Sequence, residues 1–129
     1  MHMSRHINIL IADRNRNIRE LFTRELTSDN FHVIPAKNTD DIFRILKEDT
    51  LPDLMVIDPD LTDSEGAVTL RRLREITPKL PVIVHSYRME NMHQYDEFNI
   101  SDFIIKEGNS IEYVKKAVLG IIEEFAHGL

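Results

Sequence analysis

Five short apolar runs, separated by amphipathic segments, constrain the fold of this chain more than any other feature. The runs contain much isoleucine and valine and are apolar on both faces, which is typical of buried strands in a parallel sheet. This alternation predicts a doubly wound α/β domain in which right-handed crossovers connect the strands. The runs cover residues 7–12, 31–35, 54–57, 82–85 and 103–105.

Five amphipathic segments alternate with these runs and predict helices. Thr39 is expected to cap the second helix, and Asp63 or Ser64 the third. A weakly apolar segment around residues 89–95 supplies the fourth helix. The last helix follows the fifth run and carries a clear apolar stripe between residues 111 and 125.

Length and composition narrow the class of protein. A chain of 129 residues predicts a single domain over residues 1–129, with its core at about 7–125. The absence of cysteine excludes disulfides and thiolate chemistry. A net charge of −6, with acids and bases interspersed, argues against direct binding of nucleic acid. The sequence shows no membrane span and no apolar leader, so we expect a cytoplasmic protein without a membrane partner.

Four polar residues stand directly after four of the apolar runs. They are Asp13, Asp58, Ser86 and Lys106, and they follow the first, third, fourth and fifth runs. The second run ends without such a residue, which suits an outer strand in a sheet of order 2-1-3-4-5. Because ligands bind at the carboxyl ends of parallel strands, the four side chains are expected to form one pocket.

This set of side chains fits phosphoryl transfer to an aspartate. A carboxylate can attack phosphorus and form an acyl phosphate. Asp58 is the best candidate nucleophile because its strand is central in the expected order. The Lys106 ammonium and the Ser86 hydroxyl would stabilise the charge on the phosphoryl oxygens.

A magnesium ion could be held at the same edge, but one residue opposes it. The expected ligands are Asp13, Asp58 and the backbone carbonyl of Asp60. Arg14 follows Asp13 directly and adds a positive charge there, so we expect weak Mg²⁺ binding or none. Two further possibilities are that Arg14 forms a salt bridge over Asp58 and partly replaces the ion, or that the Asp60 carboxylate supplies a ligand.

Five sequence pieces, in order, resemble those of a response-regulator receiver domain, the phosphoacceptor module of two-component signalling. They are ILIAD, IRELF, PDLMVID, PVIVHS and SDFIIK, and the resemblance extends from about residue 7 to residue 125. It implies a flavodoxin-like fold. It also implies that Asp58 is the phosphoacceptor, Asp13 an acid of the metal site and Lys106 the phosphoryl-sensing lysine. Ser86 and Phe103 would be the switch hydroxyl and the switch aromatic residue.

Three residues near this site depart from the family pattern. Arg14 replaces a second acid, and Tyr87 replaces the small residue that usually follows the switch hydroxyl. Glu107 replaces a proline that usually follows the lysine, so the bond before it is expected to be trans. These departures leave an alternative function open: a pseudo-receiver that binds a protein partner without phosphorylation.

The resemblance also implies the partners. A histidine kinase or phosphotransfer protein would donate the phosphoryl group to Asp58, and a downstream protein or attached output domain would respond. The chain itself is expected to be a regulatory domain and not an enzyme, apart from self-catalysed phosphoryl transfer and dephosphorylation. His85, next to Ser86 on the fourth run, is expected to be a hydrogen-bonded core histidine.

Overall fold

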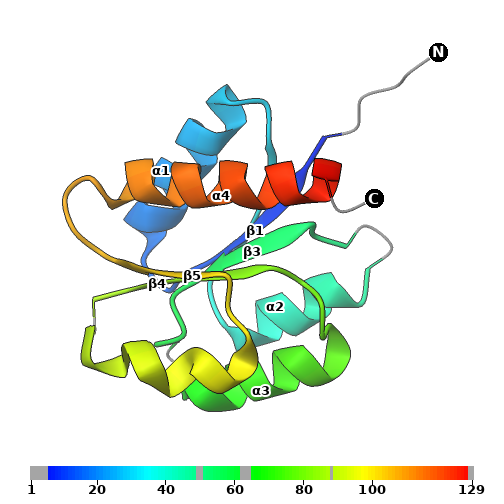
Figure 1. Ribbon diagram of the computed structural model, residues 1–129, viewed down its shortest axis with the longest axis vertical. Coiled ribbons are helices and arrows are strands. Elements are labelled where there is room, and N and C mark those ends of the chain that lie inside the picture. The colour runs from blue at the N-terminus through cyan, green and yellow to red at the C-terminus, as the bar shows by residue number, and fades with distance from the viewer. Residues whose placement is uncertain (1–5, 49–50, 62–64, 88, 128–129) are drawn as a thin grey trace.

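The computed structural model describes residues 6–48, 51–61, 65–87 and 89–127. Strands and helices alternate along these residues, as the sequence pattern predicts (Figure 1). The elements are β1 (Asn8–Ala12), α1 (Arg16–Ser28), β2 (His32–Ala36), α2 (Thr39–Leu46), β3 (Leu54–Ile57), α3 (Gly66–Ile76), β4 (Val82–Ser86), the 3₁₀ helix η1 (Met89–Phe98), β5 (Asp102–Ile105) and α4 (Ser110–His127).

The five strands form one parallel sheet of order β2-β1-β3-β4-β5. The predicted fold class and strand order are therefore confirmed. Strands β1 and β3 end level with each other, because Ala12 pairs with Ile57. The next residue, Asp58, donates its backbone N–H to the Ala12 carbonyl at 2.9 Å. This register brings Asp13 and Asp58 to the same edge of the sheet.

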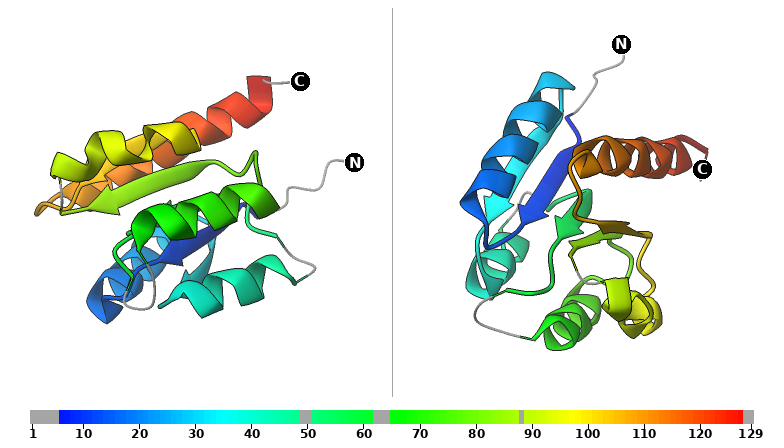
Figure 2. Two further views of the ribbon diagram at one scale, coloured as in Figure 1. Left: turned by 90° about the horizontal axis from the view of Figure 1, so that it is seen from below. Right: turned by 90° about the vertical axis from the view of Figure 1, so that its left-hand side faces the viewer.

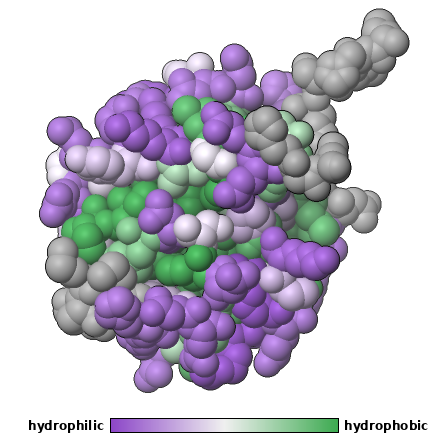
Figure 3. All heavy atoms as spheres, in the orientation of Figure 1, coloured by the Kyte–Doolittle hydropathy of each residue, from purple (hydrophilic) through white to green (hydrophobic). Residues whose placement is uncertain are grey.

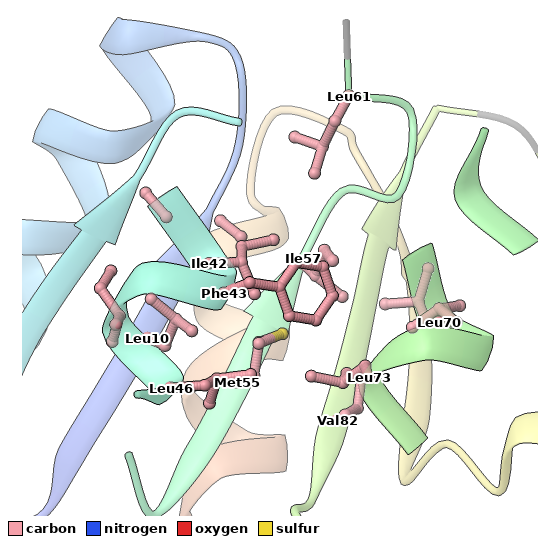
Figure 4. Packing of buried hydrophobic residues seen from close by; sticks show 14 of the residues in the cluster. Leu10, Ile42, Phe43, Leu46, Met55, Ile57, Leu61, Leu70, Leu73 and Val82 are labelled. Carbon is pink, nitrogen blue, oxygen red and sulfur yellow. The ribbon is translucent and has the colours of Figure 1, made fainter. Parts of the chain in front are cut away.

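Helices cover both faces of the sheet. Figures 1 and 2 show α1 and α4 on one face, and α2 and α3 on the other. Each face buries its own apolar cluster, to which alternate residues of β1 contribute: Leu10 faces α2 and α3, while Ile9 faces α1 and α4. Figure 4 shows Phe43 of α2 and Leu73 of α3 pointing toward Met55 on β3. The central strands are therefore buried on both sides, which explains their apolar sequences.

The face of the molecule seen in Figure 3 combines hydrophilic and hydrophobic side chains. Figure 3 shows a band of hydrophobic side chains between the two layers of helices. The groove along the β5 edge is lined by Phe103, Ile105 and Tyr113, among other residues. No helix among the described residues has the length and apolar character required to cross a lipid bilayer.

The cap of α2 differs from the prediction, and the residues predicted to cap α3 lie outside the described residues. Thr39 does not cap α2: the cap is Asn38, whose Oδ1 accepts the Asp41 backbone N–H at 2.9 Å. Thr39 already belongs to the helix, whereas Asn38 has the extended backbone that a cap residue adopts. Helix α3 begins at Gly66 after Glu65, which makes no side-chain capping bond, and residues 63 and 64 lie outside the described residues.

The fourth helix is present, but it is a 3₁₀ helix that extends beyond the predicted residue 95 to Phe98. The apolar periodicity of this segment is too weak to define where the helix begins and ends. Two of its aromatic residues, Tyr95 and Phe98, are buried against the α2 and α3 side of the core. This packing, more than any helical periodicity of the sequence, accounts for its position next to α3.

Candidate functional site

A buried ion triad lies at the carboxyl edge of the sheet. The Lys106 Nζ atom is 2.7 Å from Asp13 Oδ2 and 2.6 Å from Asp58 Oδ2. The exposed fraction of each of the three side chains is 7% or less. The structure thus brings together three of the four residues that the sequence placed at this edge, and they contact one another directly.

Backbone amides hold the remaining carboxylate oxygens of the triad. Asp13 Oδ1 accepts the N–H of Asn15 at 2.8 Å, and Asp58 Oδ1 accepts the N–H of Asp60 at 2.9 Å. Asn15 in turn caps α1, where its side chain accepts the N–H of Asn17 at 2.8 Å. Both carboxylates are therefore fixed in orientation by the loops that follow their strands.

The charge on Lys106 is maintained by its two partners. Burial works to lower the pKa of its ammonium group, but hydrogen bonds and charges from Asp13 and Asp58 outweigh burial and raise it above its usual value. The triad consequently carries two negative charges and one positive charge at a site that is largely shielded from solvent. The excess negative charge favours the approach of a further positively charged group.

Ser86 lies beside the triad at the end of β4. Ser86 is buried, and its backbone carbonyl accepts the backbone N–H of Lys106 at 2.9 Å. Phe103 is half-buried on β5, where its ring stacks with that of Tyr95 at a centroid distance of 6.4 Å. The fourth edge residue and the predicted switch aromatic residue therefore both lie on strands adjoining the site.

The two atypical residues of the later loops lie on the exterior. Tyr87 is 67% exposed, and Lys106 Nζ lies 5.1 Å from the centre of its ring. The ring lies near the ammonium group, and its π-face interacts favourably with the cation. Glu107 is exposed, and the peptide bond that precedes it is trans.

Arg14 is exposed at the rim of the site and pairs with no carboxylate among the described residues. The possibility that it forms a salt bridge over Asp58 is not realised in the structure, where Lys106 pairs with that carboxylate. Arg19 on α1 does not contact the triad side chains either, and its Nη1 donates to the backbone carbonyl of Asp13 at 2.7 Å. The residue that follows Asp13 thus carries an exposed guanidinium with no carboxylate partner among the described residues.

The described donor set fits a magnesium ion poorly. Mg²⁺ prefers several oxygen ligands in octahedral geometry. In the described part of the chain, the carboxylates of Asp13 and Asp58 meet at this edge, and both already pair with Lys106. The residues that the structure describes contain no group of three carboxylate or imidazole side chains able to hold a metal. A positive residue, Arg14, follows Asp13.

His85 forms a contact behind the triad that the sequence did not reveal. Its Nε2 lies 2.9 Å from the Ser110 Oγ at the start of α4, and its ring lies 5.1 Å from that of Phe22. The pKa of His85 is lowered to about 4, chiefly by burial and also by the nearby charge of Lys106, while Asp58 acts in the opposite direction. The expected hydrogen-bonded core histidine is confirmed. Its partner is 25 residues away, so only the fold could identify it.

Gly66 is a second residue that sequence reasoning missed. A Cβ atom at this position would lie 2.7 Å from the Pro59 Cβ and 2.9 Å from the Tyr95 Oη. Pro59 directly follows Asp58, so the lack of a side chain lets α3 begin against the acceptor loop. A glycine at the start of a predicted helix was the available signal, although it did not show which neighbour required it.

Comparison with known proteins agrees with this geometry. The sequence profile of the response regulator receiver domain matches residues 9–118. This chain belongs to the response regulator receiver family. The resemblance that the five sequence pieces predicted is thereby confirmed, and the chain is the receiver domain of a two-component response regulator.

Two curated relatives are longer than this receiver, and both are named protein-glutamate methylesterase/protein-glutamine glutaminase. The protein from Trichodesmium erythraeum is 28% identical over 130 residues, which cover 92% of this chain and 37% of the relative. The protein from Halalkalibacterium halodurans is 31% identical over 129 residues, which cover 95% and 36%. The receiver therefore spans little more than a third of the length of these relatives.

Solved receiver structures share the fold at low sequence identity. The CheY-like receiver domain from Methanospirillum hungatei has a TM-score of 0.83 at 20% identity, with 95% of this chain and 99% of that chain covered. A two-component response regulator from Clostridium difficile gives 0.82 at 20% identity, with 93% and 98% covered. The response regulator TrrA from Thermotoga maritima, solved in complex with Mg²⁺-BeF, gives 0.73 at 21% identity, with 85% and 97% covered.

Proposed function

We propose that this receiver accepts a phosphoryl group on Asp58 from a histidine kinase or phosphotransfer protein and then changes a protein-binding surface. The observation that carries the proposal is the buried triad, in which Lys106 holds Asp58 and Asp13 at the carboxyl edge of a central strand. A group of charged side chains of this kind is costly to bury. A role in accepting a phosphoryl group would explain why the protein retains the triad despite this cost.

The proposed reaction needs little movement of the triad. An Asp58 carboxylate oxygen attacks phosphorus, the P–N bond of the donor phosphohistidine breaks, and the imidazole leaves with the electron pair of that bond. Lys106 lies 2.6 Å from one Asp58 oxygen, so its ammonium remains beside the oxygens of the new acyl phosphate. The hydroxyl of Ser86, at the end of β4, donates to another phosphoryl oxygen.

The response would be read at the β5 edge of the sheet. Ser86 and Phe103 shift with phosphorylation, and Phe103 stacks on Tyr95 of η1. The proposed surface combines β5 with residues 87–95 and 111–125, beside the groove that Phe103 and Tyr113 line. A downstream protein or an attached output domain would bind there. The methylesterase relatives, with their greater length, favour an attached domain as one form of this arrangement.

The cofactor proposal follows from the donor set. The Thermotoga maritima regulator was solved in complex with Mg²⁺-BeF. In this chain the candidates for ligands are Asp13, Asp58 and the Asp60 carbonyl, and Arg14 opposes a cation at this place. Bound Mg²⁺ would supply charge neutralisation for the phosphoryl group. We expect this chain to bind Mg²⁺ weakly or not at all.

Incubation with a small phosphodonor tests the proposal. Phosphoramidate, supplied with Mg²⁺ and separately with a chelator, should raise the intact mass of the protein by one phosphoryl group. The matched control is Asp58→Asn, which removes the nucleophile and should remain unmodified. Absence of an adduct on the unmodified sequence under every metal condition would contradict the proposal.

One observation favours a second candidate, the phosphorylation-independent pseudo-receiver. Each carboxylate of the triad already holds Lys106 through one oxygen and a backbone amide through the other. Such a site is stable without a ligand and can serve as a fixed part of a protein-binding domain. In that case the protein remains unmodified by phosphoramidate, and Asp58→Asn binds the downstream partner as tightly as the unmodified sequence.

A further inference from the structure

We infer that Arg14 supplies the positive charge that a divalent cation would otherwise bring to the acceptor site, so that Asp58 is phosphorylated without a metal. The inference rests on the proposed phosphoacceptor function and specifies how the site stabilises the phosphoryl group. It begins from the mismatch between the donor set and a magnesium ion. Two carboxylates meet at this edge, and a guanidinium follows the first of them.

The formal charges of the site balance without a metal. Asp13 and Asp58 carry two negative charges, and Lys106 and Arg14 carry two positive charges, so the free site is neutral. A site with an acid in place of Arg14 carries a net charge of minus two and becomes neutral only when a divalent cation binds. The two arrangements therefore start from the same net charge.

The two arrangements also have the same net charge after the reaction. Phosphorylation converts the single charge of Asp58 into about two charges on the acyl phosphate. With Lys106 and Arg14 present and no metal, the product site has a net charge of about minus one. The acid-bearing site with its divalent cation reaches the same value. Adding Mg²⁺ to the site with Arg14 would instead leave an excess of positive charge.

The position of Arg14 suits this role. It is the residue next to Asp13, whose carboxylate shares the Lys106 ammonium with Asp58 at 2.7 and 2.6 Å. It is exposed, and its guanidinium has no carboxylate partner within the described part of the chain. By contrast, Arg16 on the next turn is engaged by Glu20 at 2.8 Å. Of these two rim arginines, Arg14 is the one available for an incoming anion.

The chemistry of the guanidinium fits a phosphoryl group. Its planar set of N–H donors can bind two phosphoryl oxygens at once. Lys106 would contact the phosphoryl group from within the pocket and Arg14 from the rim. In the test reaction, an Asp58 oxygen forms the new bond to phosphorus while the P–N bond of phosphoramidate breaks. The protonated donor nitrogen leaves as ammonia, so the step needs no additional reactant.

Initial rates of phosphorylation with phosphoramidate, in chelator and in millimolar Mg²⁺, test the inference. The unmodified sequence should react at rates that agree within about twofold in the two conditions. Arg14→Gln should react at least ~10-fold more slowly in chelator, because a donor to the transition-state charge is lost. Arg14→Asp should be slow in chelator and should recover when Mg²⁺ is added. Arg24→Gln, an exposed arginine paired only loosely with Glu25 at 3.8 Å, is the matched control and should match the unmodified sequence.

A calorimetric Mg²⁺ titration provides a second measurement that is independent of the reaction. The unmodified sequence should show no binding at millimolar Mg²⁺, and Arg14→Asp should bind the ion. An adduct that forms only with Mg²⁺, or unchanged chelator rates in Arg14→Gln, would overturn the inference and leave the phosphoacceptor function intact. Absence of an adduct in both conditions would overturn the two together.

Discussion

Lys106 forms ion pairs with two buried carboxylates at once, and the stability of the proposed acceptor site depends on it. Its Nζ lies within 2.7 Å of both Asp13 and Asp58, and all three side chains are buried. A buried ion pair contributes little net stability compared with apolar residues, but removing one partner leaves the other charge uncompensated. A single substitution at this lysine therefore affects two charges.

We predict that Lys106→Met lowers the free energy of unfolding by about 3 to 5 kcal/mol at pH 7, because Asp13 and Asp58 lose their shared cation. Urea denaturation followed by circular dichroism measures the change. Lys116→Met, on the exposed side of α4, is the matched control and should stay within about 0.5 kcal/mol. Equal stability of the two variants would contradict the role given to Lys106.

His85 makes the stability of the domain dependent on pH. Its pKa is lowered to about 4 in the folded protein, whereas an unfolded histidine titrates near 6.5. Between these values the unfolded chain binds a proton that the folded chain does not, so stability falls as the pH falls through this window. Below about pH 4 the loss is complete.

The predicted size of this effect is about 2 kcal/mol between pH 7.5 and pH 5. Urea denaturation at the two pH values should show this loss in the unmodified sequence, in addition to any loss from other groups. His85→Gln removes the titration and keeps a polar side chain near Ser110. The variant should lose about 2 kcal/mol less over the same range, and an identical pH dependence would refute the assignment to His85.

The residues of the triad could be predicted from the sequence, but the exposure of the residues beside them could not. Asp13, Asp58 and Lys106 follow apolar runs directly, so the sheet alone determines that they share an edge. Arg14 and Tyr87 lie one residue further, in loops whose paths depend on local backbone geometry. The sequence identified both as atypical, yet it could not show that both are exposed.

Helix α3 approaches the acceptor loop closely, and Gly66 makes this approach possible. The residue begins α3, and a Cβ there would lie 2.7 Å from the Pro59 Cβ. Pro59 follows Asp58, and the Tyr95 hydroxyl of η1 lies on the other side of the same contact. The start of one helix thus packs against both the acceptor loop and the neighbouring 3₁₀ helix.

We predict opposite effects for two glycine substitutions. Gly66→Ala should destabilise the domain by about 1 to 3 kcal/mol, because the added methyl group requires the acceptor loop or Tyr95 to move. Gly120→Ala in α4 adds a methyl group where nothing lies within 4 Å and should stabilise the domain by about 0.4 to 1 kcal/mol. Thermal unfolding measures both changes. The account of α3 packing would fail if the two variants shifted stability in the same direction.

The sequence predicted the presence of the strands and helices better than the residues at which they begin and end. The five strands follow from apolar runs that are too long to lie in loops and too short for helices. Helix starts depend on which of several neighbouring polar side chains reaches a free backbone N–H, and Asn38 does this in place of Thr39. The type of η1 was not predictable either, because the buried residues Tyr95 and Phe98 are three apart, a spacing that shares one face in an α helix and in a 3₁₀ helix alike.

At the scale of the molecule, two apolar clusters, one on each face, pack against a sheet whose carboxyl edge carries the proposed acceptor site. The alternation of strands and helices predicted the doubly wound sheet, and the end of the second run, without a chemical residue, suited the order β2-β1-β3-β4-β5 that the structure has. That order places β3 in the middle, so Asp58 has β1 and its Asp13 on one side and β4 with Ser86 on the other. The extent of the domain, residues 1–129 with a core at about 7–125, stays a prediction.

The position of the phosphoryl group tests the central claim most directly. After reaction with phosphoramidate, borohydride reduces an acyl phosphate on aspartate to the alcohol, which leaves homoserine at the modified position. Tandem mass spectrometry of the resulting peptides then identifies that position. Our account predicts homoserine at position 58 and none at Asp13 or Asp60. Modification at either neighbour with position 58 intact, or no modification at all, would contradict it.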